Sequence, residues 1–387
     1  MAPRYCSRCI LPDSRPGVAL DAEGVCAGCR NAERKTHLDW NSRRTAFVEL
    51  AASARAMARA RGLAHDCIVP VSGGKDSFWQ VVTCLEHGLR PLCVSYVTAG
   101  RTALGKQNLD ALARLDVELL EVRLDAEIER RFVAKAFRAT AIGGLVTHMA
   151  IYRWPVRIAL DRGIPLVVYG ENSAFEYGSD DQSLAGRVVD QRWLERFGVT
   201  AGTKAEDWID AALTAADLAP LRTPTAAELA AQPLQVVFLG WFFAWDPRRS
   251  LRIAQQHGFS GRAAGPRVGH YDFVNIDDDF IGVHHHPKWH KFGITRSFDT
   301  LSMEIRAGRM ARDAAIAFLR QRGDETPWDD IRAFCAWLGI DTAEYFRIVE
   351  GFRDRRLWLR RDGRWQIDGF LIEDFDWPVD AMAWEAP

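Results

Sequence analysis

The strongest constraint on the fold is an alternation of short apolar runs with longer helical segments between residues 42 and 170. Helical patterns cover 42–61, 78–87, 106–115 and about 125–162, and the apolar runs between and after them have the length of buried strands. These runs are DCIVPV (66–71), PLCVSYV (91–97), VELLEV (117–122) and IPLVVYG (164–170). The alternation predicts an α/β fold, with a parallel sheet covered by helices on both faces. Ligands bind such sheets at the carboxyl ends of the strands.

A glycine-rich polar loop follows the first predicted strand, within VPVSGGKDSFWQ (69–80). The loop consists of Ser72, Gly73, Gly74, Lys75, Asp76 and Ser77. The two glycines let backbone N–H groups approach an anion, and the following helix presents free N–H groups and its positive dipole end at the same place. Lysine adds a full charge, and the serines add hydroxyl donors. The loop therefore predicts a phosphate site, although it lacks the G-x-x-x-x-G-K-[ST] pattern of kinase-like NTPases.

Four cysteines near the start of the chain have the spacing of a metal site. Cys6 and Cys9 form one C-x-x-C pair, Cys26 and Cys29 form another, and sixteen residues separate the pairs. Two such pairs complete a tetrahedral four-thiolate zinc site, which we expect to be structural because it leaves no open position for a substrate. The alternative is four unrelated thiols in an N-terminal tail.

The sequence GVCAG (24–28) matches the elbow that presents the nucleophilic cysteine in one class of glutaminases. However, Cys26 already belongs to the metal spacing, and no H-x-E motif follows to supply the base and its orienting acid. The other glutaminase class uses a processed N-terminal cysteine, whereas residue 2 is alanine. We therefore predict no glutaminase in this chain.

The hexapeptide of the polar loop resembles the S-G-G-x-D-S signature of the PP-loop ATP pyrophosphatase superfamily, whose fold is a Rossmann-like parallel sheet of the adenine nucleotide alpha hydrolase type. The resemblance implies that the loop, Lys75 included, holds the β,γ-pyrophosphate of ATP while a substrate oxygen attacks the α-phosphate. It also implies that Asp76 helps to hold Mg²⁺. ATP and Mg²⁺ are therefore expected, besides the Zn²⁺ expected at the cysteines.

A wider resemblance is carried by the ribbon YCSRCILPDSRPGVALDAEGVCAGC (5–29), by the triplet Gly170-Glu171-Asn172 with Glu176 nearby, and by HHHPKWHKFGITRSFDTLSMEIRAGRM (284–310). Together with the loop, these segments resemble the N-acetyl sugar amidotransferase family, which is related to lipopolysaccharide and pseudaminic-type sugar enzymes. The similarity extends over about residues 1–320. It implies that ATP activates an amide oxygen and that ammonia then displaces AMP to give an amidine.

The resemblance assigns roles to several further residues. Gly170 and Asn172 are expected at the nucleotide, and Glu171 and Glu176 are candidates for a general base or a magnesium contact. A strand-end acid facing solvent is the alternative for both acids. In the basic segment that follows His284, His285 and His286, the resemblance favours active-site roles for Lys291 and Arg296. A metal site at the histidines and a solvated charged face remain alternatives there.

The charge balance bears on partners. Lys and Arg number 50 against 51 acids, and the net charge of -1 argues against general nucleic-acid binding. No long apolar span or signal peptide is recognisable, so we expect a cytoplasmic protein with no membrane attachment. We expect a small-molecule substrate, such as a nucleotide-linked N-acetyl sugar, and a separate glutaminase with an ammonia-channelling partner. The competing interpretations are a PP-loop enzyme that thiolates tRNA or a small molecule, and a nucleotide-binding protein without catalysis.

The predicted domain organisation has three parts. A zinc ribbon covers residues 1–40, a PP-loop domain covers 41–310 with an insertion around 200–233, and a helical region with a short hairpin covers 311–387. The aromatic run LGWFFAWDPRRS (239–250) predicts a packed core strand, with stacking on adenine or sugar as the alternative.

Overall fold

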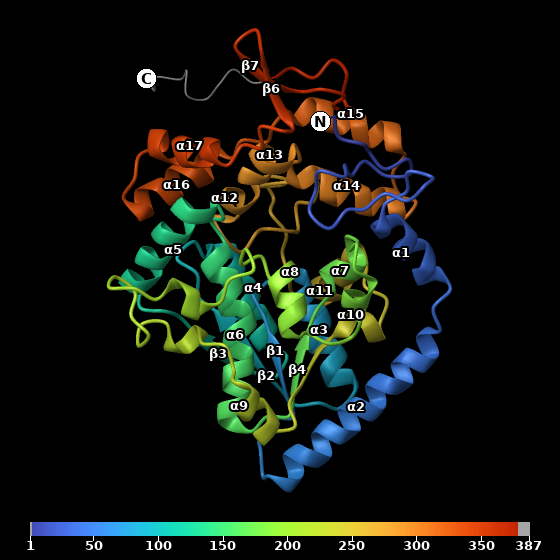
Figure 1. Cartoon of the computed structure of the whole chain (residues 1–387). Coiled ribbons are helices and arrows are strands. Elements are labelled where there is room, and N and C mark those ends of the chain that lie inside the picture. The colour runs from blue at the N-terminus through green and yellow to red at the C-terminus, as the bar shows by residue number, and fades with distance from the viewer. Residues whose placement is uncertain (1, 378–387) are drawn as a thin grey trace.

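The computed structural model describes residues 2–377 and is built around a five-stranded sheet with the order β3-β2-β1-β4-β5 (Figure 1). The strands are β1 (Cys67–Pro70), β2 (Pro91–Tyr96), β3 (Glu118–Val122), β4 (Leu166–Tyr169) and β5 (Gln235–Phe238). All neighbouring pairs are parallel, so the predicted α/β class is confirmed. Because the strand order reverses between β1 and β4, a ligand crevice is expected at the carboxyl ends of these two strands.

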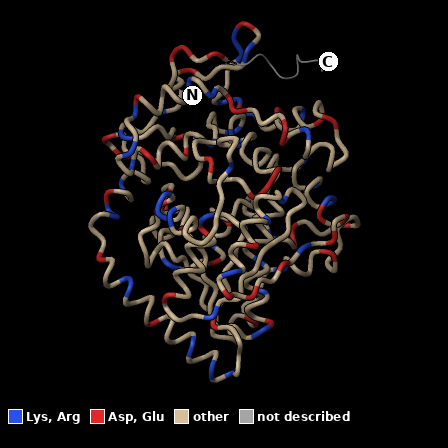
Figure 2. Tube along the Cα trace, turned by 180° about the vertical axis from the view of Figure 1, so that it is seen from behind, with Lys and Arg blue, Asp and Glu red and all other residues tan. Residues whose placement is uncertain are grey.

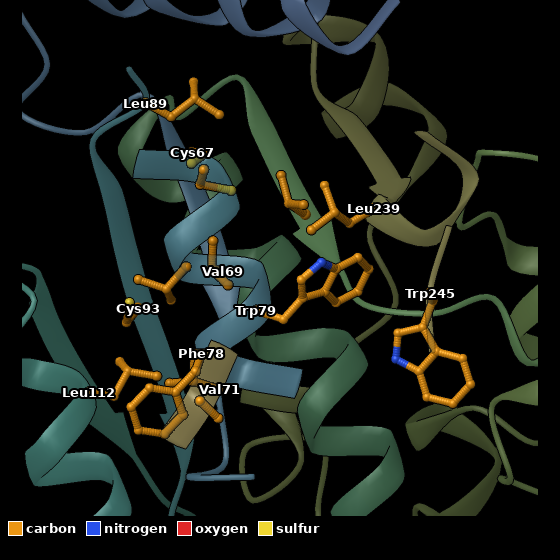
Figure 3. Close-up of a cluster of buried hydrophobic side chains, with 14 of the residues drawn as sticks. Cys67, Val69, Val71, Phe78, Trp79, Leu89, Cys93, Leu112, Leu239 and Trp245 are labelled. Atoms are coloured by element: carbon orange, nitrogen blue, oxygen red, sulfur yellow. The ribbon is translucent and has the colours of Figure 1, made fainter. Parts of the chain in front are cut away.

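Alternate side chains of each strand point to opposite faces of the sheet, and each face has its own helices. Cys67 and Val69 of β1 pack on the face covered by α2 (Trp40–Ala60), α3 (Lys75–Glu86), α4 (Ala103–Ala113) and α11 (Pro247–Gln256), as Figure 3 shows for part of this core. Ile68 points to the other face, which α6 (Leu145–Arg162) and α8 (Gln191–Phe197) cover. A fully buried aromatic ring such as Phe78 contributes about 1.5–3 kcal/mol to this core.

The C-terminal helices lie above the sheet in the view of Figure 1. They are α12 (Ile281–His285), α13 (Pro287–Phe292), α14 (Arg296–Arg306), α15 (Arg312–Arg322), α16 (Trp328–Leu338) and α17 (Thr342–Gly351). The predicted hairpin is confirmed as β6 (Trp358–Arg361) and β7 (Arg364–Ile367), which pair antiparallel across a turn at Asp362 and Gly363. No described helix is long and apolar enough to span a bilayer.

Two local predictions differ from the structure. The predicted helical zone 125–162 consists of two helices, because α5 (Ala126–Thr140) ends where Ala141 adopts a left-handed conformation with φ of 48°. The aromatic run packs in the core, as predicted, but the predicted strand is wrong. It forms the short helix α10 (Leu239–Phe242) directly after β5, and the aspartate at position 246 then caps α11 by accepting two backbone N–H groups.

The segment 200–233, predicted as an insertion, contains two 3-10 turns (Ala205–Trp208 and Ala219–Leu221) and α9 (Ala226–Ala231). Its buried Trp208 and Leu221 pack in one core with α5, α6 and α16. The remaining short helices are α1 (Ala27–Thr36) and α7 (Ser173–Glu176), with a further 3-10 turn at Gln182–Ala185.

The two ends of the chain share a core. Cys6, Ile10 and Cys26 of the predicted ribbon belong to the same buried cluster as Trp289 and Trp358. The ribbon therefore packs against residues that follow it by more than 250 positions. The domain division at residues 40 and 310 stays a prediction, and its last part, 378–387, lies outside the described residues.

Candidate active site

The polar loop connects β1 to α3 at the reversal point of the sheet, where sequence analysis expected it. Gly73 has φ of 89°, and a Cβ atom there would lie 2.4 Å from the backbone oxygen of Gly105. Only glycine fits this position without strain. Gly74 is the N-cap residue of α3 and has an ordinary φ of -75°. No side-chain hydrogen bond caps the helix at this position. A Cβ at Gly74 would meet only the Ser72 hydroxyl, at 3.4 Å, so this face of the loop is open to a ligand.

Hydrogen bonds within the loop fix its shape. The Ser72 N–H donates to the Ser77 Oγ at 3.0 Å, and the Gly74 N–H donates to the Ser72 Oγ at 3.3 Å. The Lys75 ammonium is 4% exposed and pairs with the Asp76 carboxylate at 2.5 Å. The other oxygen of Asp76 accepts the indole N–H of Trp245 at 2.8 Å. The loop therefore exposes to the cavity a carboxylate held in place by Trp245, while the Lys75 ammonium is buried in an ion pair with that carboxylate.

The predicted triplet follows β4, on the strand next to the loop. With its amide oriented so that both the oxygen and the nitrogen have partners, Gln80 of α3 accepts the N–H of Gly170 at 2.7 Å. This hydrogen bond joins the end of β4 to α3, the helix that follows the loop. Burial raises the pKa of Glu171 to about 7, and the nearby charge of Asp76 adds to the rise. Glu171 is therefore able to exchange a proton near neutral pH.

The Asn172 side chain is committed to the protein itself. Its amide nitrogen donates to the carbonyl groups of Leu184 and Gly186, at 2.8 and 2.9 Å, and its oxygen accepts from Trp193 and Ala174, both at 2.9 Å. Both donors and both acceptor positions are thus used. The predicted nucleotide contact at this position stays a prediction, and the side chain has a structural role.

Two cavities meet at this strand end. The smaller, of about 280 Å³, is lined by Ser72, Gly74 and Asp76 of the loop and by Gly170. The larger, of about 550 Å³, lies on the side of the C-terminal helices. Glu171 and Ser173 line both cavities. Glu171 therefore lies on the walls of both cavities.

The larger cavity gathers basic side chains from distant parts of the sequence. They are Arg15, Arg196, Lys288, Lys291 and Arg296, and the acids on the same wall are Glu171, Glu195 and Asp299. Burial lowers the pKa of Lys291 to about 8 and that of Lys288 to about 7. Lys291 donates to the carbonyl oxygen of Thr140. Arg296 lies 3.3 Å from Asp299, which Arg15 contacts at 2.7 Å. The predicted residues Lys291 and Arg296 thus share one cavity with the ribbon.

The three adjacent histidines lie on and just after the short helix α12, not on a strand. His284 and His285 line the larger cavity, whereas His286 contacts the Tyr345 hydroxyl at 3.0 Å. Within residues 2–377, the groups of side chains able to hold a metal do not include these histidines. Burial lowers the pKa of His284 and His285 well below the usual range, so both are neutral near pH 7.

The four cysteines converge as their spacing predicted. Their sulfur atoms all lie within 4.8 Å of one another, and all four side chains are buried. Cys6 and Cys29 are 3.8 Å apart, and Cys9 and Cys26 are 3.6 Å apart. Hydrogen bonds from the other three thiols, together with the charge of Arg306, lower the pKa of Cys9. The set fits a tetrahedral four-thiolate zinc site.

The carboxylate of Glu176 is held by an ion pair. Lys35 of α1 contacts both of its carboxylate oxygens, at 2.8 and 2.9 Å. Burial raises the pKa of Glu176, and the Lys35 charge opposes the rise. The carboxylate already has a cationic partner, which favours a positioning role over that of a general base.

Sequence analysis gave no catalytic or ligand role to several residues of the site. Burial raises the pKa of Asp277, and a hydrogen bond from Ser72 partly offsets the rise, which places this carboxylate beside the loop. Arg15 lines the larger cavity together with Lys288, which belongs to the basic segment that the sequence predicts to bind phosphate and sugar. The run of three aspartates at 277–279 was a visible signal, whereas nothing in the sequence brings Arg15 to residues almost 300 positions later.

Comparison with known proteins supports the family resemblance. Residues 268–370 match the family model described as "LPS biosynthesis protein WbpG-like, C-terminal domain". Over this segment, the match supports the expected relation to lipopolysaccharide-related enzymes. The matched segment contains Asp277, Lys288, Lys291, Arg296 and the ribbon-facing helix α14, so it supplies one wall of the larger cavity.

Other comparisons add little. No curated protein matches the chain. Among solved structures, the chain is similar to one titled "Structure of NMN synthetase from Francisella tularensis", at 12% identity and a TM-score of 0.30, over 75% of this chain and 96% of that one. A TM-score of 0.30 is too low to support an argument about fold or activity.

Proposed function

We propose that the protein is an ATP-dependent, AMP-forming amidotransferase that converts the amide of an N-acetylated sugar, or of a related small molecule, into an amidine. The observation that carries the proposal is the meeting of two cavities at Glu171. One of them contains the phosphate loop, and the other is lined by several cations. The WbpG-like match over residues 268–370 supports a sugar-related substrate.

The smaller cavity is suited to ATP. Backbone N–H groups at Gly73 and Gly74, the start of α3 and the Lys75 ammonium would hold the β- and γ-phosphates. Mg²⁺ held by Asp76 would neutralise phosphate charge. The α-phosphate would then face the larger cavity beside Glu171. On the other side of the loop, the buried residues of β1 and α3 would keep water away from the phosphates.

The larger cavity is suited to an anionic sugar derivative. Its basic side chains can neutralise a diphosphate, and a nucleotide-linked N-acetyl sugar has this charge and approximately this size. Arg296 and Lys291 would bind the diphosphate. The acetamido group would lie near Glu171, where the two cavities meet.

The reaction needs two steps. The amide oxygen attacks the α-phosphorus, the bond to the β-phosphate breaks, and pyrophosphate leaves. Ammonia then attacks the activated carbon, the C–O bond breaks with its electron pair, and AMP departs. The nitrogen that adds carries one proton too many, and Glu171 is suited to accept it because its pKa lies at about 7.

Ammonia would come from another protein, because the sequence supplies no glutaminase motif. We propose that a separate glutaminase and a channel-forming partner deliver it. The isolated chain should work with ammonium salts and not with glutamine alone, and efficient use of glutamine by the purified chain would contradict this.

Mass spectrometry of products tests the reaction type. The protein would be incubated with ATP, Mg²⁺, ammonium and a panel of UDP-N-acetyl sugars, and the expected product has gained ammonia and lost water. Replacement of oxygen by sulfur when a sulfur donor is present would instead support the thiolating interpretation. The structure offers that chemistry little support, since all eight cysteines are buried. ATP binding with no pyrophosphate release for any substrate would favour a non-enzymatic nucleotide-binding protein.

Nucleic-acid substrates have little support from the charge distribution. Lys and Arg alternate with Asp and Glu along much of the chain, as Figure 2 shows from behind. A tRNA-binding surface needs a run or stripe of basic side chains. Nucleobase absorbance that copurifies with the protein and disappears after RNase treatment would overturn this interpretation.

A further inference from the structure

The four-cysteine site is connected to the phosphate loop through helix α1. The helix begins at the metal ligands, because Cys26 is its N-cap and the Cys26 sulfur accepts the Cys29 N–H at 3.4 Å. It then extends away from α14 and passes beside α7 (Figure 1). A movement of Cys26 or Cys29 would therefore move the first turn of α1.

The last turn of α1 contacts the candidate active site directly. Lys35 donates to both carboxylate oxygens of Glu176 and, at 2.6 Å, to the carbonyl oxygen of Trp245. Trp245 in turn donates its indole N–H to Asp76 of the phosphate loop at 2.8 Å. One lysine and one tryptophan thus link the end of α1 to the loop carboxylate that is expected to hold magnesium.

A second connection comes from the WbpG-like segment. Arg306, in the last turn of α14, donates to the sulfur atoms of Cys26 and Cys9, at 3.4 and 3.7 Å. Its other terminal nitrogen donates to the carbonyl oxygen of Glu176 at 3.0 Å. The guanidinium therefore touches the metal ligands and the active-site segment at the same time.

The guanidinium of Arg306 lies directly against two of the four cysteine sulfur atoms. Four thiolates with one Zn²⁺ have a net charge of two negative units, and a buried cation beside them is compensated. Beside four neutral thiols, the same buried guanidinium would lose this compensation and would tend to move away. One guanidinium therefore joins the four-cysteine site to the backbone at Glu176.

The packing at this junction leaves little freedom. A Cβ on Gly28 of α1 would lie 2.5 Å from an Arg306 terminal nitrogen, and a Cβ on Gly178 would lie 2.5 Å from the Gly28 backbone nitrogen. Asn31 also donates to the carbonyl oxygen of Phe175 at 2.9 Å. Helix α1, α7 and α14 are thus in close contact, so a displacement of one is transmitted to the others.

We propose that Arg306 and Lys35 are positioning residues that couple the four-cysteine site to the phosphate loop, so that metal binding at the cysteines raises the affinity of the loop for ATP. The proposal rests on the proposed function for the identity of the nucleotide. Because coupling between two sites is reciprocal, ATP must raise the affinity of the cysteines for zinc by the same factor. A typical coupling of this kind is roughly fivefold to 150-fold.

The first test separates the coupling from the metal site itself. Zinc-loaded full-length protein is titrated with Mg²⁺ and ATP in a calorimeter, as wild type, Lys35→Met and Arg34→Met. Arg34 is the matched control, since it lies in the same turn of α1 but contacts only the side chains of Asn31 and Gln182. We expect Lys35→Met to keep its zinc and to bind ATP at least about fivefold more weakly, while Arg34→Met behaves as wild type.

The second test uses reciprocity and reads out metal, not activity. Zinc affinity is measured by competition with a chelator, with and without Mg²⁺ and ATP. ATP should tighten zinc binding in the wild type and should do so much less in Lys35→Met. Arg306→Met should bind zinc more weakly than Arg312→Met, whose parent side chain contacts the ribbon only through the Cys9 carbonyl oxygen, at 3.0 Å.

Two results would overturn the proposal, and they are distinguishable. If the wild type binds ATP but its zinc affinity is the same with and without ATP, the two sites are uncoupled, although the proposed function stands. If the wild type binds no ATP at all, both the coupling and the proposed function fail. Equal zinc affinities for Arg306→Met and Arg312→Met would refute the role of Arg306 but not that of Lys35.

Discussion

The two glycines of the phosphate loop should respond to alanine in opposite ways. An alanine at position 73 must adopt φ of 89°, and its Cβ would lie 2.4 Å from the backbone oxygen of Gly105. The left-handed backbone costs about 1–2 kcal/mol for a residue with a side chain, and crowding against a fixed backbone atom adds about 1–3 kcal/mol. Gly73→Ala should therefore lower the free energy of unfolding by about 2–5 kcal/mol.

Gly74→Ala should leave folding almost unchanged and impair ATP binding. The backbone there has φ of -75°, and a Cβ would meet only the Ser72 hydroxyl at 3.4 Å. Alanine at such a position is neutral or stabilises by up to about 1 kcal/mol. The methyl group, however, would occupy the space where a phosphate approaches the backbone. Losing one hydrogen bond to a charged group costs about 1.5–3 kcal/mol, which weakens ATP binding roughly tenfold to 150-fold.

Urea unfolding and ATP calorimetry on the same three proteins measure both effects. The wild type is the reference, and each variant controls for the other. A Gly73→Ala protein as stable as the wild type would contradict the close approach to Gly105. A Gly74→Ala protein that binds ATP with unchanged affinity would contradict the loop as a backbone cradle for phosphate.

Three further predictions concern the carboxylates and the metal site. The pKa of Glu171 is raised from 4.5 to about 7. The wild type should therefore lose stability relative to Glu171→Gln as pH rises from about 4.5 through 7. If urea unfolding gives the same difference in unfolding free energy between the two proteins across this range, the shift is contradicted. Trp245→Phe removes the indole N–H donated to the Asp76 carboxylate, which costs about 1.5–3 kcal/mol and should weaken Mg²⁺·ATP binding roughly tenfold to 150-fold in calorimetry; unchanged affinity would mean that the loop carboxylate is held in other ways. Cys26→Ser should lose zinc by metal analysis and unfold at lower temperature, whereas Cys335→Ser, at a buried cysteine outside the cluster, should keep its zinc; a full zinc content in Cys26→Ser would refute the site.

The strands and the cysteine site could be predicted because their signals are local. An apolar run of four to six residues between helical patterns identifies β1 to β4, and the spacing of two C-x-x-C pairs brings four sulfur atoms together. The strand β5 was missed because the aromatic residues after it have the composition of a strand themselves. Their place in α10 is decided by packing against α2 and the sheet, which the local sequence does not contain.

The shape of the candidate site was less predictable, because it depends on contacts between residues that are far apart in the sequence. The positions of Asp76 and Glu171, just after two apolar runs, predict that both lie at carboxyl ends of strands, and the structure brings both to the reversal point of the sheet. The saturated hydrogen bonds of Asn172 and the contribution of Arg15 to the larger cavity depend on residues far away in the sequence. Sequence spacing carries no information on such contacts.

The shared core of the two chain ends also has a consequence for biosynthesis. The four cysteines leave the ribosome first, but Trp289, Trp358 and Phe370, which cover them, are made last. Closing a contact over such a long stretch of chain is slow, and the apolar side of the ribbon stays exposed until then. The N-terminal segment should therefore mature late, and a truncation near residue 350 would remove Trp358 and Phe370 and leave the first thirty residues with only part of their core.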